Sequence, residues 1–276
     1  MNKTILLTGA TDGIGLETAK MLLAQGHTVL LHGRNKDKLN TVQASLNADY
    51  PQGSTVSYVA DLSDMAQVQA LAKNVLSDLQ QADKILDVLI NNAGVYKLAN
   101  ITTKAGLDAR FAVNTIAPYL LTKLLLPAMN TQSRVVNVSS AAQSSINFES
   151  LVGNRPLSDS VAYAQSKLAI TMWSRHLGLA LKGTGPLVVS VNPKSLLGSK
   201  MVKDAYGLDG GDLKLGADIF CRAALSDEFK EATGLYFDND AERFAPPHPD
   251  ALNNDKTQQL IDTLDALLRS LIIVEE

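Results

Sequence analysis

The sequence predicts an α/β fold in which a doubly wound parallel sheet carries helices on both faces. Short apolar runs of strand length recur along the 276 residues, and longer segments with apolar side chains at helical spacing separate them. The strand-like runs occupy residues 4–8, 28–31, 56–60, 86–90, 135–138 and 187–191. Because these runs are almost continuously Val, Ile and Leu, we expect both faces of the sheet to be covered, which is typical of parallel sheets.

No repeat, low-complexity tract or block of charge marks a linker before residue 240, so we expect residues 1–276 to form one domain. The segment Pro246-Pro247-His248-Pro249 is a stiff break. Beyond it, apolar residues recur at three- and four-residue spacing, at Leu260, Ile261, Leu264, Leu267, Leu268 and Leu271. This spacing predicts an amphipathic helical extension from about residue 250 that packs on the domain.

The composition argues against several classes of protein. Hydrophobic residues make up 46% of the chain and the net charge is -3, so we expect no nucleic-acid partner. No apolar run reaches the roughly 18 residues that span a membrane, and the amino terminus lacks a signal-peptide cleavage site. We therefore expect a cytoplasmic protein without a membrane partner. A single cysteine, Cys221, and histidines without metal-ligand spacing predict neither an internal disulfide nor a metal site.

A glycine-rich turn follows the first strand-like run and precedes an amphipathic helix. Such glycines let the backbone approach a pyrophosphate, and the N–H groups at the start of the helix favour the anion. The glycine spacing is four then two, which differs from the two-then-three spacing of the G-x-G-x-x-G fingerprint, and ordinary turn chemistry is the alternative. The position in the chain favours dinucleotide binding of the Rossmann type, by Gly9, Thr11, Asp12, Gly13, Ile14 and Gly15.

The end of the second run bears on the choice between NAD and NADP. An acidic residue there would bind both ribose hydroxyls of NAD, whereas an arginine accommodates the 2′-phosphate of NADP. Arg34 lies 19 residues after Gly15, and no carboxylate occurs before Asp37, so we expect NADP rather than NAD. The alternative is that Arg34 simply begins a solvated helix. Asp12 argues the other way, because its charge would repel a phosphate placed nearby.

Further segments complete a recognisable order along the chain. They are Asn91-Asn92-Ala93-Gly94, Asn114, Ser139-Ser140 and Tyr163-Ala164-Gln165-Ser166-Lys167. Together with the glycine turn they resemble the short-chain dehydrogenase/reductase family, from about residue 3 to about residue 240. The long insert between Ser140 and Tyr163 resembles the branch that contains retinol dehydrogenases and WW-domain oxidoreductases. A retinoid substrate is not carried over from that resemblance.

The chemistry of the last segment can be argued from the residues. Tyr163 and Lys167 are four residues apart, so a helix places both on one face. A phenol has an ordinary pKa of about 10, which a neighbouring ammonium and an oxidised nicotinamide would lower. The resemblance implies that Tyr163 is the general acid/base and that Ser140 positions the substrate oxygen. It also implies that Lys167 tunes Tyr163 and binds the nicotinamide ribose, and that Asn114 holds a water leading to solvent.

The same resemblance extends the cofactor site. It implies that Asp61 and Leu62 flank the adenine, although Asp61 could instead cap the helix that starts near Asp64. It further implies that Asn91, Ala93 and Gly94 line the ribose side, and that Pro193 lies near the nicotinamide carboxamide. Family members usually have glycine after that proline, whereas this chain has Lys194. We hypothesise that activity survives this departure.

The sequence therefore predicts an oxidoreductase that interconverts a small-molecule carbonyl and alcohol with NADP(H). A catalytically weak NADP-binding sensor or scaffold is the alternative, and Lys194 is the feature that favours it. A sugar-nucleotide epimerase also uses a Tyr-x-x-x-Lys pair, but it normally needs another glycine spacing and an added substrate domain. Residues 195–211 could close over a substrate or form an ordinary crossover, and Tyr96 or Phe148 could supply an apolar contact. A homo-oligomer is possible.

Overall fold

One eight-stranded sheet organises the computed structural model, which describes residues 2–272. The strand order is β3-β2-β1-β4-β5-β6-β7-β8. The strands are β1 (Thr4–Leu7), β2 (Thr28–Gly33), β3 (Ser54–Val59), β4 (Val88–Asn91), β5 (Arg134–Val138), β6 (Leu187–Asn192), β7 (Tyr236–Asp238) and β8 (Arg243–Ala245). The order reverses between β1 and β4, which confirms the predicted doubly wound, Rossmann-type fold and marks a switch point where such sheets bind ligands.

The last two strands were not predicted. β7 pairs parallel with β6, but β8 pairs antiparallel with β7, so the predicted parallel sheet gains one antiparallel strand at this edge. Each of these strands has three residues, which is too short to show a hydrophobic period in the sequence. The six predicted strands all form, and no end differs from its predicted position by more than two residues.

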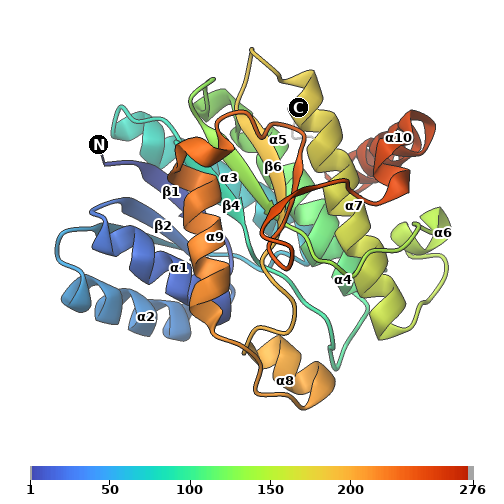
Figure 1. The fold of residues 1–276 in the computed structure, drawn as a ribbon, viewed down its shortest axis with the longest axis horizontal. Coiled ribbons are helices and arrows are strands. Elements are labelled where there is room, and N and C mark those ends of the chain that lie inside the picture. Colours follow the sequence, from blue (N-terminus) through green and yellow to red (C-terminus); the bar gives the residue numbers. More distant parts are fainter. Residues whose placement is uncertain (1, 273–276) are drawn as a thin grey trace.

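Helices cover both faces of the sheet (Figure 1). On one face α1 (Gly13–Ala24), α2 (Lys36–Asp49) and α9 (Leu213–Leu225) bury one apolar cluster against the strands. On the other face α3 (Met65–Gln81), α5 (Ala117–Leu125) and α7 (Asp159–Ala180) bury a second. The shorter helices are α4 (Ala109–Phe111), α6 (Phe148–Leu151) and α8 (Lys200–Tyr206), with helical turns at Ala112–Ile116, Leu126–Ala128, Asp227–Phe229 and Pro249–Leu252.

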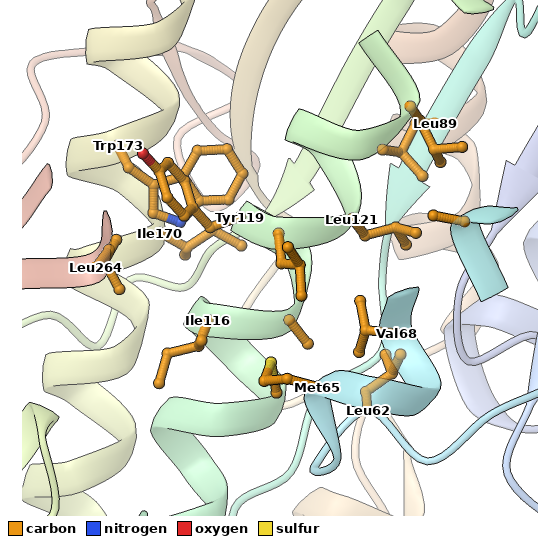
Figure 2. Packing of buried hydrophobic residues seen from close by; sticks show 14 of the residues in the cluster. Leu62, Met65, Val68, Leu89, Ile116, Tyr119, Leu121, Ile170, Trp173 and Leu264 are labelled. Carbon is orange, nitrogen blue, oxygen red and sulfur yellow. The ribbon is translucent and has the colours of Figure 1, made fainter. Parts of the chain in front are cut away.

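The final helix α10 (Asn254–Leu271) packs beside α7, where the amphipathic spacing predicted a packed helix. Leu264 is fully buried and belongs to the same apolar cluster as Tyr119 and Trp173, whose rings meet edge to face at 5.6 Å (Figure 2). Asp265 of α10 accepts hydrogen bonds from Tyr119 Oη at 2.9 Å and Lys123 Nζ at 2.8 Å on α5. α10 thus closes the outer side of the helix layer formed by α5 and α7.

One continuous helical stretch is long and apolar enough to cross a membrane by length and composition. It runs from Ala109 to Ala128, where no such segment was expected from the sequence. In the fold, 72% of this stretch is buried, because it lies between the sheet and neighbouring helices. A buried core helix of a folded domain satisfies the same length and composition test, so this feature is weak evidence for a membrane span.

Candidate active site

The glycine turn between β1 and α1 has a backbone that glycine adopts most easily. Gly9 and Gly13 have φ of +67° and +54°, in the left-handed region. A Cβ added to Gly15 would lie 2.2 Å from the carbonyl oxygen of Gly9 and collide with it. The glycines therefore allow a tight turn without side chains at the N-terminus of α1. Such a cradle fits the pyrophosphate of a dinucleotide.

Two polar residues hold this turn against the end of β4. Asn92 Nδ2 donates to the carbonyl oxygens of Thr8 at 2.9 Å and Gly9 at 3.1 Å. Thr8 Oγ1 accepts a hydrogen bond from the backbone N–H of Ala93 at 3.0 Å. The turn is thereby fixed across the switch point. The predicted site omitted Asn92 and Thr8, although polar side chains at two neighbouring strand ends were a signal that they could meet.

A buried histidine supports the same turn from β2. His32 is 3% exposed; its Nδ1 accepts from the N–H of Gly9 at 3.2 Å, and its Nε2 lies 3.0 Å from the carbonyl oxygen of Ala60. Burial lowers the pKa of His32 to about 4, although the hydrogen bond to Ala60 opposes this, so the ring is neutral at physiological pH. A neutral ring with its proton on Nε2 satisfies both contacts. His32 was also missed; a polar residue in an apolar strand was the available signal.

The charge of Asp12 is compensated within the chain. Asp12 caps α1 by accepting from the N–H of Gly13, and its other oxygen lies 2.6 Å from Lys38 Nζ on α2. The hydrogen bond from Lys38 is the largest cause of the lowered pKa of Asp12, against the effect of burial. Arg34 is exposed directly after β2. The predicted repulsion between Asp12 and a phosphate is therefore weakened by a neighbouring cation.

The predicted adenine residues are used partly for local structure. Asp61 Oδ1 accepts from the N–H and hydroxyl of Ser63 at 2.9 and 2.8 Å. Asp64, rather than Asp61, caps α3. Leu62 is 6% exposed and packs in the core beside Met65 and Val68 (Figure 2). Only the backbone of Leu62 remains for the predicted adenine contact, which stays a prediction for both residues.

The predicted catalytic side chains meet where β4, β5 and α7 converge. Lys167 is 3% exposed, and its Nζ donates to the carbonyl oxygen of Val138 at 2.7 Å and lies 5.7 Å from the centroid of the Tyr163 ring. Ser140, two residues beyond β5, lies beside Tyr163, and its side chain lowers the pKa of the phenol. A Cβ on Gly94 would stand 3.6 Å from Lys167 Nζ, so the turn after β4 borders this cluster.

Asn114 lies in a π-helical turn, Ala112–Ile116, of the kind that often occurs at functional sites. Its Oδ1 accepts from the N–H of Val95 at 2.8 Å, and its Nδ2 donates to the carbonyl of Val95 at 2.9 Å and to Ser166 Oγ at 3.0 Å. The side chain thus joins the segment after β4 to the catalytic helix. Since both amide protons are used, the side chain positions the site, and the predicted water relay stays a prediction.

The protonation states differ from the sequence expectation. Burial raises the pKa of Tyr163 to about 12, although the hydrogen bond from Ser140 lowers it. Burial also lowers the pKa of Lys167 to about 8. Burial thus dominates in the chain by itself, and the expectation that Lys167 and an oxidised nicotinamide together lower the pKa of Tyr163 stays a prediction for the complex with cofactor. The ammonium of Lys167 donates to the carbonyl oxygen of Val138, and desolvation of the phenol is the largest cause of the raised pKa of Tyr163.

The position of Ser140 is fixed by groups that sequence reasoning missed. Its carbonyl oxygen accepts from Gln143 Nε2 at 2.8 Å and from Tyr236 Oη at 3.2 Å. Gln143 belongs to the long insert, and Tyr236 belongs to the unpredicted strand β7. No sequence pattern connected Tyr236 with Ser140, because the two residues lie 96 positions apart.

Residues 3–206 match the family model described as short chain dehydrogenase. The chain belongs to this family. The predicted resemblance to the retinol dehydrogenase branch is also confirmed. Retinol dehydrogenase 12 of Bos taurus is 32% identical over 271 residues, which cover 94% of this chain and 84% of that protein. Retinol dehydrogenase 11 of Homo sapiens is 37% identical over 195 residues, covering 69% of this chain and 60% of that protein.

Solved structures share the fold of this chain. An uncharacterized protein from Mycobacterium Paratuberculosis superimposes with a TM-score of 0.79 at 26% identity, covering 97% of this chain and 93% of that chain. A metagenomic short-chain oxidoreductase in complex with NADP has a TM-score of 0.62 at 28% identity, with 80% and 90% coverage. The family assigns this chain to the oxidoreductases with a nicotinamide cofactor.

Within this dehydrogenase fold, the side chain of Asn91 has a structural task. Asn91 is 3% exposed, and its Nδ2 donates to Thr122 Oγ1 at 3.1 Å and Asn137 Oδ1 at 2.8 Å, beneath the end of the sheet. Only its backbone remains for the predicted cofactor contact. Ala93 and Gly94 follow it directly and border the glycine turn and Lys167, respectively.

The family's Pro-Gly position is strained in this dehydrogenase. Pro193 is buried, and Lys194 has φ of +116°, a backbone conformation that favours glycine. The backbone conformation expected of the family glycine is thus kept even though the residue has changed. Ser199, which follows six residues later, lies against Gly13 of the glycine turn.

The substrate side of the dehydrogenase site carries tyrosines. Tyr96 meets Tyr163 edge to face at 4.9 Å, and Tyr206 of α8 lies 6.0 Å from Tyr96. Lys97 Nζ donates to the carbonyl of Ala205 at 3.3 Å and fastens α8 to the segment after β4. Phe148, the other predicted apolar contact, packs instead against the core beside Met172, because α6 places it there.

Proposed function

We propose that this chain is an NADP-dependent oxidoreductase that interconverts a carbonyl and an alcohol, with Tyr163 as general acid/base. The observation that carries the proposal is the convergence of Tyr163, Ser140 and Lys167 beside the turn after β4. Open doubly wound sheets bind ligands at this end of their strands. Asn114 braces the same turn against the catalytic helix.

The protonation states support carbonyl reduction as the direction for which the free chain is prepared. A phenol with a pKa of about 12 keeps its proton at neutral pH and can donate it to a developing alkoxide. Ser140 Oγ can donate a hydrogen bond to the same substrate oxygen and share its charge. Lys167, whose pKa is about 8, can supply the proton that Tyr163 gives up. The nicotinamide cofactor, when bound, supplies the hydride.

The basic residues near the glycine turn support NADP over NAD. Arg34 is exposed after β2, where a 2′-phosphate is expected, and Lys38 pairs with Asp12 at 2.6 Å. Thr11 packs against this strand end, since a Cβ on Gly33 would lie 2.7 Å from its methyl group. Solved relatives in complex with NADP, such as the metagenomic oxidoreductase, add support.

The proposed substrate class rests on the two tyrosines beside Tyr163. Tyr96 and Tyr206 offer apolar ring surface beside Tyr163, which suits an aldehyde or ketone with an apolar body. Relatives named retinol dehydrogenases place retinal in the panel of substrates to be tested. An angucycline C-6 ketoreductase with bound NADP, 27% identical with a TM-score of 0.66 over 86% of this chain and 93% of its own, places cyclic ketones there too.

The decisive experiment follows NADPH and NADH consumption with a panel of aldehydes, ketones, diones and retinal. We expect NADPH consumption that falls at least about a hundredfold in Tyr163→Phe, since general acid catalysis contributes about that much. The matched control is Tyr119→Phe, which changes another buried tyrosine, on α5, that has no proposed catalytic role. This variant should keep the wild-type rate. Equal rates in wild type and Tyr163→Phe would reject the assigned role of Tyr163.

The preference for NADPH over NADH is tested with variants of Arg34 and Lys38. Arg34→Ala should raise KM for NADPH about tenfold or more with little change for NADH, because it removes a charged partner of the phosphate. Lys38→Ala should act in the same direction, because it exposes the phosphate to the charge of Asp12. A wild-type preference for NADH would show the NADP assignment to be wrong.

A catalytically weak NADP-binding sensor is the second candidate, and the strained backbone at Lys194 is the observation that favours it. Tight NADPH binding in fluorescence titrations without turnover on any substrate would support it.

The single domain over residues 1–276, the cytoplasmic location and the absence of nucleic-acid or membrane partners stay predictions. So does the possible homo-oligomer, which sedimentation of the purified chain tests.

A further inference from the structure

Asp240 lies in the turn between β7 and β8 and faces the segment that follows β6. Its Oδ1 accepts from the backbone N–H of Ser195 at 2.9 Å, and its Oδ2 accepts from Ser195 Oγ at 2.6 Å and from Asn192 Nδ2 at 2.9 Å. Burial alone would raise the pKa of Asp240, but these hydrogen bonds and the charge of Lys194 lower it. The carboxylate therefore stays ionised, and both of its oxygens accept hydrogen bonds.

The residues next to Asp240 hold the same segment. Asp238 Oδ1 accepts from Asn192 Nδ2 at 2.8 Å, and Asn239 Nδ2 donates to the carbonyl oxygen of Pro193 at 2.9 Å. Asn192 and Asn239 are 2% and 7% exposed, so both bonds are shielded from water. Three consecutive residues at the end of β7 and the start of the following turn, Asp238 to Asp240, thus hold residues 192–195. We call this set of hydrogen bonds the Asp240 clamp.

The gripped segment has a backbone that the chain would not adopt unaided. Lys194 has φ of +116°, and Leu196, two residues later, has φ of +54°. Side chains other than glycine disfavour this region, so the conformation persists only where surrounding contacts determine it. The ion pair from Lys194 Nζ to Glu242 is 3.7 Å long, and the Glu242 side chain is 73% exposed, which makes it a weak restraint. The Asp240 clamp is therefore the stronger of the two restraints on this segment.

We propose that Asp240 is a positioning residue that holds the Pro193–Lys194 turn in this conformation and thereby shapes the nicotinamide end of the cofactor site. The proposal rests on the proposed function, because Pro193 is assigned to the cofactor by family resemblance. It also accounts for a lysine where the family has glycine, since the clamp replaces the freedom that glycine would supply. Loss of the clamp should matter less once glycine is restored.

The test combines cofactor binding with hydrogen exchange. NADPH binding is titrated by fluorescence for wild type, Asp240→Ala, Lys194→Gly and the double variant, and exchange is followed in peptides covering residues 192–199. Asp240→Ala should raise the NADPH dissociation constant about tenfold and speed exchange at the Ser195 amide. The double variant should recover most of the binding. Asp240→Asn, which keeps an acceptor for that amide, should fall between wild type and Asp240→Ala.

Two controls separate the clamp from other effects. Glu242→Gln removes the ion partner of Lys194 and should change NADPH binding by less than about twofold, as expected for an exposed pair. Leu252→Ala, at an exposed residue outside the site, should change neither binding nor exchange at residues 192–199.

Unchanged exchange at residues 192–199 in Asp240→Ala would overturn the proposal. So would a binding loss that Lys194→Gly does not reduce, because a merely structural role predicts lower stability without such rescue. A wild-type chain that binds no NADPH would reject the proposed function and the cofactor role of the clamp. Exchange at Ser195 would then still show whether Asp240 holds the turn.

Discussion

Lys167 is a cation placed where water does not reach it. Its ammonium donates to the carbonyl of Val138, the residue is 3% exposed, and no carboxylate within residues 2–272 forms an ion pair with it. Burial therefore makes the charged form costly and lowers the pKa to about 8. The chain accepts this cost at a residue that the proposed mechanism needs, which is typical of functional sites.

The stability of the fold should depend on pH through this residue. Folding lowers the pKa of Lys167 from 10.5 to about 8, so between these values the unfolded chain binds more protons and stability rises with pH. The gain between pH 7 and 9.5 should be about 2 kcal/mol. Tyr163, whose pKa folding raises to about 12, acts oppositely, and its contribution is lost only as pH rises from 10 through 12.

Urea unfolding of wild type and Lys167→Met at pH 7, 8 and 9.5 tests this. The difference in free energy of unfolding between the two proteins should change by that amount, in favour of wild type at high pH. Surface groups cancel in this difference. Parallel pH profiles would show that Lys167 titrates normally and that its ammonium is better solvated than its burial indicates.

At the scale of elements, helix α7, which carries Tyr163 and Lys167, is anchored at its first residue. Arg110 on α4 is fully buried and forms a bidentate pair with Asp108, through Nε at 2.8 Å and Nη2 at 2.5 Å, and a further pair with Asp159. Asp159 begins α7, one turn before Tyr163. The pair therefore fixes where the helix starts relative to the segment that carries Asn114.

Removal of Arg110 should loosen this anchor. Arg110→Ala leaves Asp108 largely buried without its partner, so we expect a loss of about 3–5 kcal/mol in free energy of unfolding. Chemical denaturation measures it. Arg155→Ala, at an exposed arginine of the insert, is the matched control and should change stability by at most about 0.5 kcal/mol. A loss below about 1 kcal/mol for Arg110→Ala would mean that the ion pairs gain little over solvated charges.

At the scale of the whole molecule, the C-terminal helix completes a core begun more than a hundred residues earlier. α10 places Leu264 beside Tyr119 and Trp173, on the side of α5 and α7 that faces away from the sheet (Figure 2). The insert before Tyr163 adds Phe148 to the same cluster. Chain segments outside the alternating strands and helices thus stabilise the layer that carries Lys167.

Leu264→Ala should therefore reduce stability without removing chemistry. Truncation of a fully buried leucine costs about 2–5 kcal/mol, whereas Leu252→Ala, at a side chain 52% exposed, should cost far less. Thermal and urea unfolding give the two values. Turnover per folded molecule at 25 °C should match wild type, and a selective loss of turnover in Leu264→Ala would instead connect α10 to the active site.

Much of the fold and of the candidate site was predictable from local patterns. The six long strands, the glycine turn and the pairing of Tyr163 with Lys167 on one helix depend on residues that are close in sequence. Lys194 was recognisable as unusual through the family resemblance, which led us to expect glycine after Pro193. β7 and β8 were not predictable, because three-residue strands form only where a neighbouring strand offers its edge. Tyr236, Asp240 and His32 went unnoticed, since each acts on a partner far along the chain.

The sequence by itself determined the strand and helix periodicity, the tight turns that glycine permits and the identity of the reactive groups, all of which depend on short-range sterics and side-chain chemistry. Only the tertiary structure decided the charge states and the supports of the site. Burial, which no local pattern measures, raises the pKa of Tyr163 and lowers those of Lys167 and His32. Asp240 and Asn239, in the turn between β7 and β8, hydrogen bond to the residues on either side of Lys194, whose positive φ its own side chain disfavours.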